Sequence, residues 1–82
     1  MNVNLRPFEE LVAKLQEYGF GEGADEIAML MSSAWTTSSE FTGELGRAVL
    51  RFQREHPAVS TDLHDTLDRC IREVRIVWPD IQ

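Results

Sequence analysis

The sequence has little of what a secreted, membrane-spanning or disulfide-stabilised protein needs. Cys70 is the only cysteine, so the chain can form no internal disulfide bond and no cysteine-based zinc site. The longest uninterrupted apolar run, Ile27–Met31, is far too short to span a bilayer. The first residues also lack the apolar stretch of a signal peptide. We therefore expect no membrane association and a location in the reducing cytoplasm.

Positive charge is scarce as well. Eight basic residues stand against fourteen acidic ones, and the formal net charge is −6. A protein of this charge repels phosphate backbones, so we predict no nucleic-acid partner. Arg47, Arg51 and Arg54 do share one flank of a predicted helix. The helix dipole and nearby acids of the fourth predicted helix account for this stripe, and a specific anionic partner is the alternative.

Hydrophobic spacing of three and four residues recurs in four segments, and no segment shows the alternation of a strand. The spacing predicts helices over residues 7–18, 24–35 and 38–55, and a fourth from Ser60 or Thr61 to just before Pro79. A chain of 82 residues makes one domain, residues 1–82. Short connections favour antiparallel neighbours. We therefore predict an all-α fold, a compact four-helix up-down bundle, irregular because two helices are short and two long.

Several residues mark the expected helix ends. Gly19 is predicted to end the first helix in a left-handed conformation, with 20–23 as the following turn. Thr37 and Glu40 have the spacing of a capping box before the third helix, and Ser60 is a candidate cap for the fourth.

A search for chemistry finds two weak candidates. His64 precedes Asp68 by four residues, which could hold a metal, but acids in a first helical turn more often pair with arginines four positions on. Asp65 would then pair with Arg69, and Asp68 with Arg72. Cys70 falls on the apolar stripe of its helix, which is typical of a buried thiol rather than a nucleophile. We predict no enzymatic activity, no catalytic residue, no bound metal and no cofactor.

Two glycines inside the third predicted helix are harder to explain. Gly43 and Gly46 each cost a helix about 1 kcal/mol relative to alanine, yet the apolar pattern continues through them. Together with Leu50 they form a second face that invites close approach by another group. Either the second helix or Trp35 fills this notch, or it binds a second chain. In the second interpretation, exposed apolar residues would extend the interface: Met29, Ile76 and Trp78.

The stretch Ser38-Ser39-Glu40-Phe41-Thr42-Gly43-Glu44, with the late Ile76-Val77-Trp78-Pro79, resembles a group of small uncharacterised bacterial proteins. In these proteins a similar motif opens a helix and a tryptophan lies near the chain end. The resemblance implies an all-helical bacterial domain, and it brings no activity, ligand or catalytic residue with it.

Size, charge and helical content favour a small acidic module for protein–protein interaction, adaptor- or immunity-like in character. A small core also makes a homodimer a natural arrangement. The alternative is a weak small-ligand or metal-binding protein that uses His64 with Asp65 or Asp68.

Overall fold

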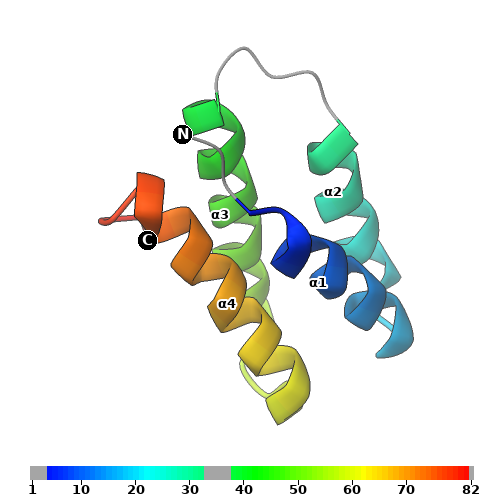
Figure 1. Cartoon of the computed structure of the whole chain (residues 1–82). Coiled ribbons are helices and arrows are strands. Elements are labelled where there is room, and N and C mark those ends of the chain that lie inside the picture. Colours follow the sequence, from blue (N-terminus) through cyan, green and yellow to red (C-terminus); the bar gives the residue numbers. More distant parts are fainter. Residues whose placement is uncertain (1–3, 33–37, 82) are drawn as a thin grey trace.

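The computed structural model describes residues 4–32 and 38–81, and within these ranges the chain forms four α-helices and no strand (Figure 1). The helices are α1 (Arg6–Glu17), α2 (Gly21–Ser32), α3 (Ser38–Glu55) and α4 (Thr61–Val77). The first two have 12 residues each, and the last two have 18 and 17. The predicted all-α bundle of two short and two long helices is confirmed.

The four helices form a ring in which each packs against two others. α1 packs on α2, α2 on α3, α3 on α4, and α4 back on α1, with successive helices running in opposite directions (Figure 1). Among the described residues, no Cα atoms of the diagonal pairs α1/α3 and α2/α4 lie within 8 Å of each other. Each groove on the surface is therefore formed by two neighbouring helices.

The end of α1 follows the sequence prediction. Gly19 is left-handed, with φ of +86°. The N–H of Phe20 donates to the carbonyl oxygen of Leu15 at 2.7 Å, and the N–H of Gly19 donates to that of Gln16 at 3.3 Å. These two bonds form a Schellman cap, which satisfies carbonyl groups that the helix end would leave unpaired.

The start of α2 does not follow the prediction. The helix begins at Gly21, directly after the cap, so 20–23 do not form a separate turn and the expected start at Ala24 is wrong. A glycine is needed inside this first turn for packing rather than for chain reversal. A Cβ atom at Gly23 would lie 3.3 Å from two ring carbons of Phe52, so the missing side chain lets this ring approach the backbone of α2.

The long helices match the sequence more closely. α3 begins at Ser38 and ends at Glu55, as predicted. Ser60 caps α4, since its Oγ accepts a hydrogen bond from the N–H of Leu63 at 3.3 Å. Thr37, predicted to cap α3, and Trp35, the predicted end of the second helix, lie outside the described residues.

The buried core draws unequally on the helices. α4 places six residues in the interior, whereas α2 places only Ala24 and Ile27 there. The largest fully buried apolar side chains, from α1, α3 and α4, are Phe8, Leu11, Leu15, Leu45, Val49, Leu63, Leu67 and Val74.

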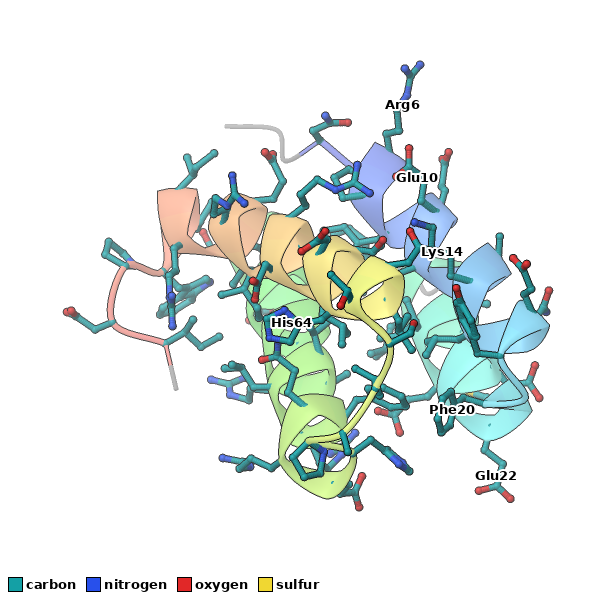
Figure 2. The ribbon with its side chains drawn as sticks, turned by 90° about the horizontal axis from the view of Figure 1, so that it is seen from below. Arg6, Glu10, Lys14, Phe20, Glu22 and His64 are labelled. Atoms are coloured by element: carbon teal, nitrogen blue, oxygen red, sulfur yellow. The ribbon has the colours of Figure 1, made fainter. Side chains whose placement is uncertain are left out.

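Polar side chains join the two helices most distant in sequence, α1 and α4. Lys14 Nζ lies 2.6 Å from Asp62 Oδ1, and the hydroxyl of Tyr18 donates to Asp62 Oδ2 at 3.0 Å. Glu10 lies one turn before Lys14 on α1 (Figure 2). Arg69 Nη2 of α4 lies 2.8 Å from Glu10 Oε2. Hydrogen bonds from Lys14 and Tyr18 hold the pKa of the Asp62 carboxyl below its ordinary value.

Candidate functional site

The glycine face of α3 is filled by the chain itself. Gly43 and Gly46 are both buried. A Cβ atom at Gly46 would lie 2.6 Å from Val74 Cγ1 and 2.8 Å from Ile81 Cδ1, and one at Gly43 would lie 3.3 Å from Trp78 Nε1. The glycines thus permit close approach of α4 and the residues after it, and a second chain has no access to this notch. The notch predicted at Gly43 and Gly46 is therefore closed from within, by α4 and the residues that follow it and not by α2, which leaves no open notch for the predicted interface.

The other residues of the predicted interface lie apart from one another. Leu50 is half-buried and packs against the core. Met29, Ile76 and Trp78 are exposed, with 68 %, 56 % and 39 % of their surfaces accessible. Met29 belongs to α2, whereas Ile76 lies on α4, diagonally across the bundle. The six residues therefore do not form one surface.

The surroundings of the two candidates for chemistry, His64 with Asp68 and Cys70, are those of structural residues. His64 Nδ1 lies 3.4 Å from Asp68 Oδ2 on the same helix, and the described residues contain no group of three histidine, cysteine or acidic side chains placed to hold a metal. Cys70 is fully buried, and burial raises the pKa of its thiol to about 12. A thiol with this pKa is not a nucleophile at neutral pH.

The arginines find partners other than those predicted. Arg69 pairs with Glu10 of α1, not with Asp65, and Asp68 pairs with His64, not with Arg72. The partner of Arg69 lies across the seam between α1 and α4, which periodicity along one helix does not reveal, whereas His64 and Asp68 have the four-residue spacing seen in the sequence.

The arginine stripe of α3 is corrected in the same way. Arg47 Nη1 contacts Glu44 Oε1 of its own helix at 2.8 Å, and Arg51 pairs with Glu26 of α2. The sequence predicted partners for this stripe among the acids of the fourth helix. Neither Arg47 nor Arg51 pairs with one of these acids.

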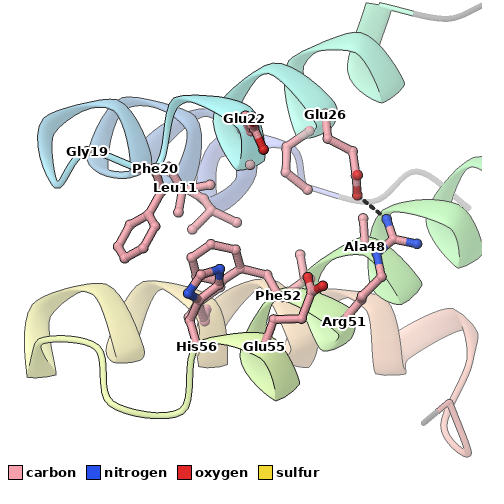
Figure 3. A pocket seen from close by; sticks show the side chains of 15 residues that line it. Leu11, Gly19, Phe20, Glu22, Glu26, Ala48, Arg51, Phe52, Glu55 and His56 are labelled. Carbon is pink, nitrogen blue, oxygen red and sulfur yellow. Dashed lines mark hydrogen bonds and ion pairs between the residues drawn. The ribbon is translucent and has the colours of Figure 1, made fainter.

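A cavity of about 540 Å³ opens between α2 and α3, at the end of the bundle where α1 turns into α2 (Figure 3). Its volume falls within the range of about 300–1,000 Å³ typical of binding pockets. The side chains that reach its rim come from the α1–α2 turn, the first half of α2 and the last turns of α3: Phe20, Glu22, Glu26, Arg51, Glu55 and His56.

Three rings form one end of this cavity. Phe20 meets Phe52 edge to face, with ring centroids 5.1 Å apart and planes at 88°. His56 lies against both, with its centroid 4.5 Å from that of Phe52 and 4.9 Å from that of Phe20. The Schellman cap places Phe20 here, and Gly23 makes room for Phe52. The rings therefore form a preorganised wall.

Charged side chains line the rest of the rim. Three carboxylates, those of Glu22, Glu26 and Glu55, stand against the single guanidinium of Arg51. Arg51 pairs with Glu26 across the groove, as Figure 3 shows. Within the described residues, the side chains of Glu22 and Glu55 form no hydrogen bond or ion pair, and the rim therefore carries excess negative charge.

The floor of the cavity offers a bound group little apolar surface. The aliphatic side chains that line it from below, such as Leu11, Ile27 and Leu67, are at most 3 % exposed. A group that enters the groove would meet carboxylates and aromatic rings first. Such a surface suits a cation better than an apolar side chain, because rings and carboxylates both attract positive charge.

This site was missed by reasoning from the sequence. The sequence pattern predicted a turn at Phe20 and Glu22, and nothing in it linked His56 to them. The spacing of four residues between Glu22 and Glu26, and between Arg51 and Glu55, was the available signal. It becomes informative only when α2 and α3 are known to be antiparallel neighbours.

Comparison with known protein families, curated proteins and solved structures finds no match to this chain. The resemblance to small bacterial helical proteins therefore stays a prediction. Among the described helices, none has both the length and the apolar character that crossing a membrane requires.

Proposed function

We propose that this protein is a non-enzymatic, cytoplasmic protein-interaction module whose α2–α3 groove binds a basic segment of another protein. The observation that carries the proposal is the groove itself, in which two carboxylates without partners face a preformed wall of three rings. The net charge of −6 adds long-range attraction for a basic partner.

The same charge bears on the choice of partner. Two copies of a chain with a net charge of −6 repel each other, and the glycine notch that favoured a homodimer is filled from within. A partner of opposite charge meets neither obstacle. Complementary charge of this kind speeds association and selects among partners more than it raises affinity, so we expect a transient complex.

Titration of the full chain, labelled with 15N, with an octapeptide of alternating arginine and glycine tests the proposal. We expect saturable shift changes at Phe20 and Glu22 and in the last turn of α3, and none with an octapeptide of alternating glutamate and glycine. Shift changes that do not saturate, or that lie on another face, would contradict it.

A matched pair of double variants separates the groove from general acidity. Glu22→Gln with Glu55→Gln removes two charges from the rim, and Glu9→Gln with Glu17→Gln removes two exposed charges from α1. The net charge is the same in both. We expect the rim variant to lose at least about threefold in affinity, the equivalent of one exposed ion pair, and the α1 variant to bind as the wild type does. Equal losses in the two variants would show attraction to the acidic surface as a whole and would refute the groove.

A further inference from the structure

Two levels of the α2–α3 groove each have one charged residue of α2 facing one of α3, and we call each level a rung. One rung is a complete ion pair and the other is not. In the complete rung, Glu26 of α2 meets Arg51 of α3. One helical turn from it on each helix lie Glu22 and Glu55, and both line the cavity. Residues four apart share one face of a helix. Because α2 and α3 are antiparallel, stepping back from Glu26 and forward from Arg51 leads to the same end of the groove (Figures 1 and 3).

The second rung has an acid on each side and no cation between them. The two helices that place an acid opposite a base in the first rung place two like charges on opposite walls here. Two carboxylates on facing walls leave a site that a positive group from outside would complete.

The site favours one chemical type of positive group over the others. The described residues contain no group of three metal-ligating side chains, so Glu22, Glu55 and His56 do not form a three-ligand metal centre. A guanidinium is planar and offers N–H donors along more than one edge, so it can serve carboxylates on two walls at once, and it stacks on aromatic rings. An ammonium is a compact point charge that lacks this flat face.

We propose that the groove binds a single arginine side chain of the partner protein, whose guanidinium bridges Glu22 and Glu55 beside the wall of Phe20, Phe52 and His56. The inference rests on the proposed function and narrows it from a basic segment to one type of residue. The internal pair of Arg51 with Glu26 is the precedent, because there the chain already joins α2 to α3 through a guanidinium.

Three octapeptides that alternate glycine with arginine, lysine or citrulline test the inference on the full chain. Citrulline has nearly the shape of arginine without its charge. We expect the arginine peptide to bind about fivefold more tightly than the lysine peptide, because only a guanidinium can serve both carboxylates at once and so gains a second exposed ion pair. The citrulline peptide should not bind measurably.

The double variants show where the preference arises. The Glu22→Gln, Glu55→Gln protein should bind the arginine and lysine peptides equally, and the Glu9→Gln, Glu17→Gln protein should keep the wild-type ratio. Equal binding of the two peptides by the wild type, or a preference that survives in the rim variant, would overturn the arginine site and leave the proposed function standing. If neither peptide binds, both proposals fail. Agmatine supplies the same cation as a small molecule, and if it binds as tightly as the peptide, the site is not one for a protein partner.

Discussion

Replacing Gly46 by alanine should destabilise the bundle, although alanine is the better helix former. In an open helix interior the change would stabilise the protein by about 1 kcal/mol. Here the new methyl group would lie 2.6 Å from Val74 Cγ1 and 2.8 Å from Ile81 Cδ1. Both distances are shorter than real Cβ contacts, so the neighbours must shift: Ile81 Cδ1 ends a flexible side chain and can give way, whereas Val74 is fully buried. Overpacking of this kind costs about 1–3 kcal/mol.

The balance of the two effects is a net loss of about 1 kcal/mol, because Val74 is fully buried and has no space to move into. For a domain of this size such a loss lowers the melting temperature by about 4–8 °C. Urea unfolding followed by circular dichroism at 222 nm would measure it, with the m-value as a check that the transition stays two-state.

Two further glycines calibrate the measurement. A Cβ at Gly21 would meet nothing within 4 Å, so Gly21→Ala should raise stability by about 0.4–1 kcal/mol. A Cβ at Gly43 would meet Trp78 Nε1 at 3.3 Å, a tight contact that needs a small adjustment, so Gly43→Ala should fall between the other two. If Gly46→Ala is as stable as the wild type or more so, the packing of α4 into this notch is refuted.

A double-mutant cycle then tests the cause. Val74→Ala removes the two methyl groups that the new Cβ would meet. Gly46→Ala should therefore cost less in the Val74→Ala background than in the wild type, with a coupling energy above about 0.5 kcal/mol. Additive effects of the two changes would show that the strain lies elsewhere.

Two other predictions concern single ionisable groups. The thiol of Cys70, with its pKa raised to about 12, should react with Ellman's reagent at pH 8 only as the protein unfolds, and rapid labelling of the native protein would contradict its burial. The pKa of Asp62 is lowered by folding, so the unfolded chain binds a proton more readily there than the native one. Its contribution to stability is thus complete above its ordinary pKa of 3.8 and is lost as the pH falls through the lower folded value. Asp62→Asn should lose less stability than the wild type over this acid range, as urea unfolding at a series of pH values would show, and parallel curves would argue against the Lys14 and Tyr18 hydrogen bonds.

Local rules predicted the features that depend on near neighbours in the chain. The left-handed Gly19, the Ser60 cap and both ends of α3 follow from residue preferences within one turn. The start of α2 did not, because Gly21 and Gly23 read as chain reversal although the second of them serves packing against Phe52.

Features that join two helices were beyond these rules. The spacing of Gly43 and Gly46 correctly indicated a close approach, but it carried no information on which segment approaches. The groove was invisible for the same reason, since Glu22 and Glu55 lie on one cavity only after the helices are placed.

The small share of the core that α2 contributes has a consequence for the motions of the bundle. Helices held by few buried side chains detach at a lower free energy than the rest of a domain. With only Ala24 and Ile27 fully buried, α2 should exchange its amide hydrogens fastest of the four helices in their central turns. This helix is also one wall of the groove. A bound partner that links the two walls would therefore restrict this opening and slow the amide exchange of α2. The complex could then be detected by this slower exchange even where the average structure of α2 does not change.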